Sequence, residues 1–505
     1  MFLSLYSKNV HIQNQADIFK SLLLQIQRST DLKKKEEWAA SAVHLANFGS
    51  TGYHSSDIIE KVYTDIAQQH SVPLSPDYVA DTFLHVMTEA YRTGGHTRVV
   101  ERWIESALPH QQHSVVMIRE SEEGALNLLQ TNTAATGGSL ILLNQNQSNL
   151  EKALELRILA SRYQHIILHV HMNDTIPLMA FGTEEFKRPI IFYNHADHRF
   201  WLGCSIADVV VELRDWGIEL SKQRRAYNAP YFKLGIPLKN DAKRTKADKQ
   251  EARDKLHIPQ DALVITTVGS FFKYKPLLHL NFIPTARKLL QADDRIRIIA
   301  IGPSYDTLPD WRLLHDEYQE RFQALGSLPP DTMFQYLACS DLSIDSYPMA
   351  GGTALIDAVT SECPVLSLEC PTGQLDYVHQ SGIYCKDEDI LVDRALKLLR
   401  DKQAAKENCE GVYNAMIQTC GTASWKAKLP EIYNMASTHK LHPFQTPAHN
   451  LKAYSLLDLE IEATNATTYT RRKAGFLGLW ERQTHRYAVG EKKEIILFNL
   501  LRISR

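Results

Sequence analysis

Short apolar runs that are rich in β-branched residues alternate with longer amphipathic stretches along most of this chain. Such alternation predicts buried parallel strands that are joined by crossover helices. A first group of runs comprises "TFLHVMTEA" (82–90), "SVVMIRE" (114–120), "SLILLN" (139–144), "HIILHVH" (165–171), "PIIFYNHA" (189–196) and "DVVVEL" (208–213). A second group comprises "ALVITTVGS" (262–270), "RIRIIAIGP" (295–303), "FQALGS" (322–327), "DLSIDSYP" (341–348) and "PVLSLEC" (364–370). We therefore expect an α/β fold with two doubly wound, Rossmann-like domains that face a cleft.

The stretch "KNDAKRTKADKQEARDKLHIPQD" (239–261) is heavily charged and separates the two groups of runs. It predicts a first domain over residues 79–238 and a second over residues 239–435. Residues 1–78 have helical periodicity without strand runs, which predicts an added N-terminal helical segment. We expect this segment to serve self-association or partner binding. Residues 436–505 are predicted to form a helical tail that partly packs back on the first domain.

The chain's composition excludes several classes of protein. With 505 residues and a net charge of −2, it lacks the basic surplus of a nucleic-acid-binding protein. Its seven cysteines include no CxxC pair, which favours reduced thiols over a disulfide framework or a zinc site. We found no window long enough for a membrane span and no signal peptide, so we expect a cytoplasmic protein.

The end of the tail has a distinct charge pattern. Residues 471–505 carry nine Lys or Arg against three Asp or Glu, interleaved with apolar residues. Basic amphipathic segments can bind anionic membranes, so one hypothesis is peripheral contact with the inner face of the membrane. The alternative, a terminal helix that packs across the two domains, is the one we favour because packing explains most apolar stripes.

A glycine pair precedes a helix-like stretch in "SYPMAGGTALIDAVTSE", directly after a predicted strand. Open parallel sheets bind ligands at the carboxyl ends of their strands, and a helix N-terminus suits a phosphate. Gly351 and Gly352 allow close approach, Thr353 can cap the helix, and Asp357 can accept hydrogen bonds from sugar hydroxyls. The alternative is a plain strand-to-helix turn.

Two other predicted strand ends carry residues suited to a diphosphate. "VGSFFKYKP" follows the first strand of the second domain and contains Gly269, Ser270, Lys273 and Lys275. The next strand ends at Gly302. A diphosphate needs cations as well as a helix terminus, so we expect these residues to bind it. Solvated loop lysines are the alternative.

The stretches "ARDKLHIPQDALVITTVGSFFKYKP" and "GSLPPDTMFQYLACSDLSIDSYPMAGGTALIDAVTSECPVLSL" resemble the donor-binding half of GT-B glycosyltransferases. The nearest likeness is to the O-GlcNAc transferase-like group, and it covers about residues 80–435 in motif order. That group has a lysine in a "YK" loop near the donor pyrophosphate, which matches Lys275. It also has a glycine- and hydroxyl-rich loop before a ribose-binding aspartate, which matches the loop at residues 351–353 and Asp357.

The chain departs from that family at two points. The family's loop often holds a histidine beside its threonines, whereas this loop has the sequence "MAGGTA". The glutamate pair of many retaining GT-B enzymes is also missing, which leaves the inverting or retaining outcome open.

Histidines mark the expected acceptor side. His96 follows the first predicted strand and can accept a proton from an attacking hydroxyl; capping the helix or binding a donor phosphate are its alternatives. In "YNHADHRFW", His195 and Asp197 follow a strand, and we expect them to line the cleft, with Asp197 as an orienting carboxylate. A solvated polar turn is the alternative. We expect no metal because no partner cluster with metal-ligand spacing occurs.

The resemblance implies transfer of a hexosyl or N-acetylhexosaminyl group from a nucleotide sugar, expected to be UDP-linked. The acceptor would be a hydroxyl or amide on a protein or glycan, with no further cofactor. A nucleotide-sugar epimerase of the same fold is an alternative, although its paired glutamates are absent. A non-catalytic carbohydrate- or partner-binding module is another, which would not need Lys275, Thr353 and Asp357 together.

Overall fold

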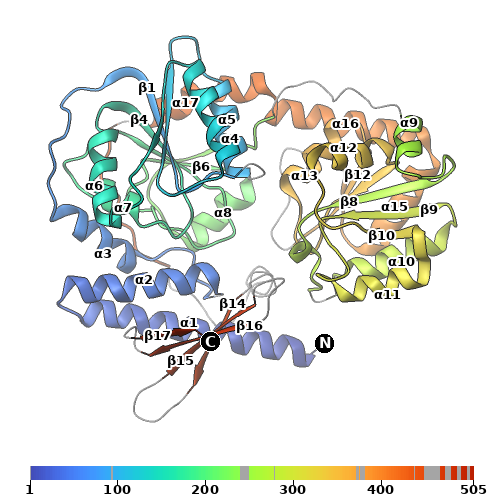
Figure 1. Ribbon diagram of the computed structural model, residues 1–505, viewed down its shortest axis with the longest axis horizontal. Helices are drawn as coiled ribbons and strands as arrows, with labels where there is room; N and C mark the ends of the chain where they lie inside the picture. Colours follow the sequence, from blue (N-terminus) through green and yellow to red (C-terminus); the bar gives the residue numbers. More distant parts are fainter. Residues whose placement is uncertain are drawn as a thin grey trace.

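The computed structural model describes residues 2–49, 51–91, 95–238, 249–277, 279–370, 375, 381–436 and 438–447, and strands at 467–472, 479–485, 491–497 and 501–504. Of residues 2–12 and 14, and of these four strands, only the backbone is described. Two parallel sheets organise the chain and lie in separate units, which confirms the predicted α/β class (Figure 1).

The first unit is built on a seven-stranded parallel sheet of order β3-β2-β1-β4-β5-β6-β7. Its strands are β1 (Val79–Met87), β2 (Gln112–Met117), β3 (Leu140–Leu142), β4 (Tyr163–His169), β5 (Ile190–Tyr193), β6 (Val209–Glu212) and β7 (Tyr231–Lys233). Phe83 on β1 pairs with His113 on β2 and with His165 on β4. Each expected run of the first group overlaps one strand, whereas the three residues of β7 are too few to produce a periodic signal.

The second unit is built on a six-stranded sheet of order β10-β9-β8-β11-β12-β13, also parallel throughout. Its strands are β8 (Leu263–Val268), β9 (Ile296–Ile301), β10 (Phe322–Ala324), β11 (Leu342–Ile344), β12 (Val365–Leu368) and β13 (Tyr384–Cys385). The inner strands are largely buried on both faces, as expected where helices cover a parallel sheet on both sides.

Helices cover both faces of each sheet. Those of the first unit are α4 (Gly95–Glu105), α5 (Glu123–Ala135), α6 (Asn149–Ala160), α7 (Ile176–Phe181) and α8 (Asp215–Arg224). Those of the second are α9 (Lys249–Lys255), η1 (Phe271–Tyr274), α10 (Phe282–Ala292), α11 (Pro309–Tyr318), η2 (Gln319–Arg321), α12 (Pro330–Cys339), α13 (Gly352–Thr360), α15 (Glu388–Arg400) and α16 (Lys402–Cys420). Parallel crossovers place the loops that follow each strand at one edge of the sheet, so the site-bearing loops of each unit gather there.

The N-terminal segment is helical, as predicted. It comprises α1 (Phe2–Arg28), α2 (Leu32–Phe48) and α3 (Asp57–Gln68). Asp31 and Ser56 cap α2 and α3 by accepting hydrogen bonds from backbone N–H groups in the first turn. Phe19, Val43 and Tyr63 lie in one apolar cluster with residues of the first sheet. The segment therefore extends the core of the first unit and is not a detached domain.

The end of the second domain was predicted wrongly. Helix α17 (Thr422–Met435) packs on the first sheet, although the sequence assigned it to the second domain. The indole N–H of Trp425 donates to the Gly235 carbonyl (2.7 Å), and that of Trp103 donates to the Tyr433 hydroxyl (2.7 Å). Figure 1 shows α16 and α17 in orange, running from one unit to the other. The chain returns at Gly421, between these helices, because the apolar stripe of α17 is buried on the first unit.

The prediction of a helical tail was also wrong. The described parts of the tail are strands: β14 (Thr467–Arg472), β15 (Leu479–His485), β16 (Glu491–Leu497) and β17 (Leu501–Ser504), which form an antiparallel sheet. Threonine-rich "TTYTRR" and the β-branched residues of "EKKEIIL" favour strands over a helix. The side chains of this segment lie outside the described residues, so the expected membrane contact stays a prediction.

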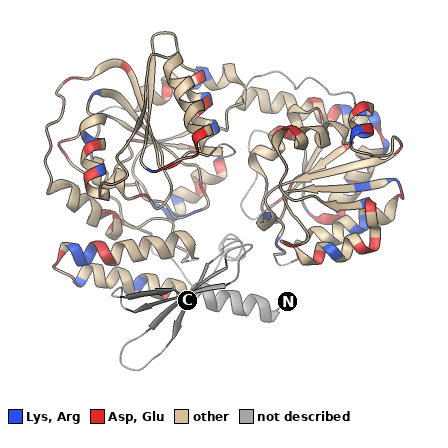
Figure 2. Cartoon of the chain, viewed as in Figure 1, with Lys and Arg blue, Asp and Glu red and all other residues tan. Residues whose placement is uncertain are grey.

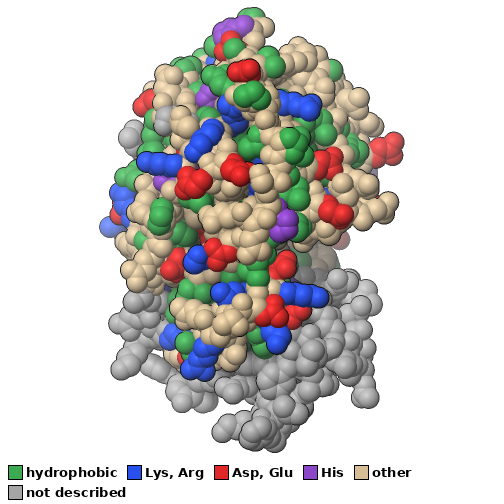
Figure 3. Space-filling model, turned by 90° about the vertical axis from the view of Figure 1, so that its left-hand side faces the viewer, with side chains coloured by type: hydrophobic (Ala, Val, Ile, Leu, Met, Phe, Trp, Pro, Cys, Tyr) green, Lys and Arg blue, Asp and Glu red, His purple; other side chains and the backbone are tan. Residues whose placement is uncertain are grey.

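Charges of both signs are interspersed over the two units (Figure 2). The face in Figure 3 likewise mixes basic, acidic and apolar side chains. No helix in the described part of the chain has the length and apolar character needed to cross a membrane.

Candidate functional site

The start of α13 depends on a buried carboxylate that the sequence interpretation missed. Asp345, just after β11, accepts hydrogen bonds from the backbone N–H groups of Ser346 (2.8 Å) and Gly351 (2.9 Å) and from the Ser367 hydroxyl (3.1 Å). Burial raises the pKa of Asp345 to about 6, against the lowering effect of Lys273 and of these hydrogen bonds. An acidic residue inside the apolar run "DLSIDSYP" was the signal that could have revealed it.

The two glycines before α13 have different surroundings. A Cβ atom on Gly351 would lie 2.7 Å from Oδ1 of Asp345, so a side chain there would displace the carboxylate. A Cβ atom on Gly352 would have only Cδ1 of Ile236 nearby, at 3.6 Å, which is an ordinary contact. Gly351 is therefore required by the fold, whereas Gly352 leaves room beside the helix N-terminus.

The expectation that Thr353 caps α13 is wrong. The N-cap is Gly351, whose backbone is extended, and no side chain caps this helix. Thr353 is the second helical residue and is half-buried. The first turn of α13 carries the partial positive charge of a helix N-terminus.

Gly269 and Gly302 lie against each other where β8 and β9 end. A Cβ atom on Gly302, whose φ is +111°, would lie 2.0 Å from the Gly269 carbonyl oxygen. A Cβ atom on Gly269 would lie 3.0 Å from the Cβ of Ser346. Close packing of three strand ends thus explains both glycines. Ser270, the next residue, is the N-cap of η1 but makes no side-chain capping bond.

Helix η1 carries the two lysines of the "FFKYKP" loop. Lys273 donates from Nζ to the carbonyl of Ala350 (3.0 Å), and its own carbonyl accepts from the N–H of Met349 (3.2 Å). Tyr274 is buried, and its hydroxyl lies 2.8 Å from that of Thr267. Lys275 ends η1 and is half-buried. Lys273 and Tyr274 therefore anchor η1 to the loop that leads into α13.

The two units meet through α4 and α13. An Arg98 guanidinium nitrogen lies 3.9 Å from Oδ2 of Asp357, and both side chains remain partly exposed. One turn further along α4, Arg102 donates to the carbonyl of Pro237. The Arg98–Asp357 contact thus places α4, the helix after β1, beside α13, the helix after β11.

Three partly buried histidines lie together at the carboxyl edge of the first sheet. The rings of His96 and His195 are stacked with centroids 3.9 Å apart, and His171 lies edge-on to His96 at 5.7 Å. Burial, and then the neighbouring His171, lowers the pKa of His96 to about 4. Burial also lowers the pKa of His195 well below its ordinary value, with further effects from His96, His169 and His171. Both rings are therefore neutral at pH 7.

Asp197 is engaged in a buried ion pair. Its carboxylate accepts from Nε of Arg214 (2.6 Å) and lies 3.4 Å from Nδ1 of His198. Burial alone would raise the pKa of Asp197, but Arg214 and His198 outweigh it and hold the pKa far below its usual range. Its partners are thus Arg214 and His198, not His195, and it stabilises the loop that carries His195.

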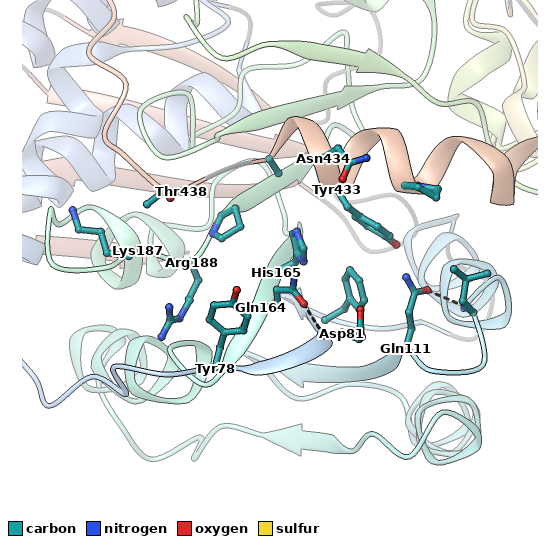
Figure 4. A pocket seen from close by; sticks show the side chains of 15 residues that line it. Tyr78, Asp81, Gln111, Gln164, His165, Lys187, Arg188, Tyr433, Asn434 and Thr438 are labelled. Atoms are coloured by element: carbon teal, nitrogen blue, oxygen red, sulfur yellow. Dashed lines mark hydrogen bonds between the residues drawn. The ribbon is translucent and has the colours of Figure 1, made fainter.

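A separate pocket of about 630 Å³ lies at the opposite, amino-terminal edge of the first sheet (Figure 4). Arg188 lies over the ring of Tyr78, 4.9 Å from its centroid, and donates to the carbonyls of Ser161 (2.8 Å) and Ser75 (2.9 Å). The guanidinium of Arg188 therefore joins two backbone segments, at Ser161 and at Ser75. Within the described ranges, no group of three or more His, Cys, Asp or Glu is placed to bind a metal ion.

Neither a family model nor a curated protein sequence matches this chain. Solved structures do match. HepE from Anabaena in complex with UDP-glucose superposes with a TM-score of 0.54 at 13% identity, over 70% of this chain and 99% of that chain. A glycosyltransferase from Rickettsia africae gives 0.53 at 14% identity, over 71% and 98% of the two chains.

The O-GlcNAc transferase of Thermobaculum terrenum gives a TM-score of 0.50 at 15% identity, over 84% of each chain. At these identities the likeness concerns the arrangement of the backbone alone. The two parallel sheets, the helices that cover them and these superpositions show that the chain has the GT-B glycosyltransferase fold.

Proposed function

We propose that this protein transfers a sugar from a nucleotide-sugar donor, UDP-linked, to a hydroxyl or amide of a protein or glycan acceptor. The observation that carries the proposal is the N-terminus of α13, which has room beside Gly352 and belongs to a helix that the Arg98–Asp357 contact joins to α4, the helix of His96. The fold supports it too, since HepE of the same fold was solved in complex with UDP and with UDP-glucose.

The donor would lie against the second unit. The positive end of α13 suits a phosphate, and Lys275 at the end of η1 would add a positive charge. Asp357, one turn into the same helix, would accept from the ribose hydroxyls. Lys273, Gly269 and Gly302 would act indirectly, because their contacts hold η1 and the strand ends in place.

The acceptor would approach from the first unit. His96 is neutral at pH 7 and can take the acceptor's proton while the acceptor oxygen or nitrogen bonds to the anomeric carbon. The bond from that carbon to the diphosphate breaks, and the nucleoside diphosphate leaves with the bonding electrons. We assign Asp197 no part in the proton transfer, since Arg214 and His198 occupy its carboxylate.

A thermal-shift screen with UDP, GDP and dTDP tests the donor first. A ligand at 100 times its dissociation constant should raise the free energy of unfolding by about 2.7 kcal/mol. Incubation with the corresponding sugar nucleotides then separates the alternatives: release of the nucleoside diphosphate supports a transferase, whereas an epimerised sugar would contradict it. Failure of all three nucleotides to stabilise the protein would overturn the proposal.

A further inference from the structure

Four imidazoles form a hydrogen-bonded row across the first sheet. Nδ1 of His113 lies 2.9 Å from Nε2 of His85, Nδ1 of His85 lies 3.1 Å from Nε2 of His169, and Nδ1 of His169 lies 3.1 Å from Nε2 of His195. The row crosses from β2 through β1 and β4 to the loop after β5. It therefore connects the interior of the sheet with the stacked pair His195 and His96 at its carboxyl edge.

Aromatic side chains hold the row in place. His85, His113 and His169 are fully buried. Trp103 on α4 is edge-on to His85 (5.8 Å between centroids) and to His169 (5.6 Å). Tyr193 lies against His169 at 5.6 Å and against His195 at 4.6 Å. With the rings fixed on both sides, their hydrogen-bond geometry is held as well.

The contacts restrict the rings to two collective arrangements. A neutral imidazole carries one N–H and one bare nitrogen, so each bond in the row needs an N–H from one ring and a lone pair from the next. Every bond joins an Nδ1 to an Nε2. Either all donors are Nδ1–H, pointing toward His195, or all donors are Nε2–H, pointing toward His113. If one ring adopted the other tautomer, the remaining rings would have to adopt it as well to keep their hydrogen bonds.

The buried end of the row favours the first arrangement. Nε2 of His113 is buried and has no hydrogen-bond partner among the residues described. In the Nε2–H arrangement this atom would be an unpaired buried donor; in the other it is only an unpaired lone pair. Orphaned buried N–H groups are the rarer of the two in proteins. The Nδ1–H arrangement is therefore the more stable one.

We propose that His113, His85 and His169 are positioning residues that fix His195 in its Nδ1–H tautomer, so that it offers an N–H to an anionic oxygen of a nucleotide sugar. This rests on the proposed function. His195 is partly buried, and its Nδ1 makes no hydrogen bond with the described part of the chain. The arrangement divides two tasks: His195 donates a hydrogen bond, and His96, stacked on it, stays available to accept a proton.

Nitrogen NMR on the full-length protein labelled with ¹⁵N-histidine tests the proposal, because protonated and bare imidazole nitrogens resonate far apart. His195→Gln assigns the His195 signals. In the wild type at pH 7.5 we expect His195 to be Nδ1–H. His85→Phe breaks the row, so His195 should become a mixture of both tautomers. His85→Gln, whose amide can accept on one side and donate on the other, should restore the wild-type tautomer.

His165→Phe is the matched control. His165 lies on the same face of β4, stacked on Phe83, but forms no hydrogen bond with the row. This variant should keep the His195 tautomer while perturbing the core similarly. An Nε2–H His195 in the wild type would overturn the proposal, even if His85→Phe failed to fold. An unchanged tautomer in folded His85→Phe would also overturn it.

Titration with UDP tests the contact with the ligand. UDP should shift the Nδ1 signal of His195, and His195→Gln should weaken UDP binding about tenfold. Wild-type affinity in that variant would overturn the contact. The tautomer is measured without ligand, so a protein that binds UDP and shows the expected tautomers but transfers no sugar would contradict the proposed function and not the role of the row.

Discussion

Arg98 on α4 and Asp357 on α13 form an ion pair between the two units, with 3.9 Å between the guanidinium nitrogen and the carboxylate oxygen. Exposed pairs of this kind typically contribute at most about 1 kcal/mol. The proximity matters more for function, because Asp357 is the residue expected to bind ribose. A bound nucleoside would then compete with Arg98 for the same carboxylate.

The first prediction separates these roles. Asp357→Asn should weaken binding of UMP and UDP alike, because the ribose is common to both. Arg98→Gln removes the competitor and should leave UMP affinity unchanged or slightly increased, with a loss of at most about 1 kcal/mol in the free energy of unfolding. Calorimetric titration of both variants checks this. Normal UMP binding by Asp357→Asn would exclude the ribose role.

The second prediction uses the glycine pair. Gly351→Ala should destabilise the protein by about 1–3 kcal/mol, because its Cβ would lie 2.7 Å from the Asp345 carboxylate. Gly352→Ala has space and should change the free energy of unfolding by less than about 1 kcal/mol. If a phosphate lies at this helix start, however, Gly352→Ala should lower UDP affinity. Chemical denaturation and calorimetry measure both effects, and equal destabilisation by the two substitutions would contradict the geometry.

The third prediction concerns Lys275. Its removal in Lys275→Ala should weaken UDP binding by about 1.5–3 kcal/mol, the usual range for a hydrogen bond to a charged group. Lys255→Ala is the control, because that lysine lies on the exposed surface of α9 and pairs with Glu251 (2.6 Å). The two affinities can be compared by calorimetry. UDP binding of equal strength in both variants would remove Lys275 from the donor site.

The fourth prediction concerns His96 as the base. His96→Ala should lower the transfer rate by about 10²–10⁴-fold and leave UDP affinity nearly intact. Because the pKa of His96 is lowered to about 4, the neutral, active form persists below pH 6. The rate should therefore fall only as the pH drops toward 4. A wild-type pH–rate profile with its acid limb near pH 6.5 would contradict this assignment.

The fifth prediction concerns stability in acid. Burial lowers the pKa of His113 and of His169 to about 3, whereas in the unfolded chain both have a pKa near 6.5. Below about pH 6.5 the unfolded state binds protons that the folded state does not, so the free energy of unfolding falls as the pH drops. Above about pH 6.5 the contribution of these histidines to stability is fully present. Each such histidine contributes a slope of up to about 1.4 kcal/mol per pH unit. Urea denaturation at several pH values measures the slope.

One variant isolates that contribution. In His113→Phe the free energy of unfolding should fall less steeply as the pH drops, by the contribution of one histidine, because the buried imidazole that resists protonation is gone. The wild-type protein, measured at the same pH values, is the reference. If the variant and the wild type had the same slope, His113 would not be held neutral in the folded protein.

The local sequence pattern determined the fold class. β-branched runs with amphipathic stretches between them can bury both faces of a strand only in a covered parallel sheet, so the order of elements and the edge that carries the loops followed from the chain itself. The short strands β7 and β13 were not predicted, because two or three residues are too few to show a hydrophobic periodicity. The prediction of a helical tail was wrong because it relied on an apolar stripe, whereas the β-branched residues of "TTYTRR" and "EKKEIIL" favour strands.

Tertiary structure decided how the candidate residues combine. A side chain at position 351 would clash with Asp345, six residues away in the sequence. A side chain at position 302 would clash with the carbonyl of Gly269, at the end of a neighbouring strand. The row of histidines joins residues 28 and 84 positions apart through the pairing of β1 with β2 and with β4. A strand's period of two says that alternate residues share a face, but not which strands are neighbours or in which register. The sequence could therefore name His96 and His195 as candidates, while only the folded sheet brought them into contact with the buried imidazoles behind them.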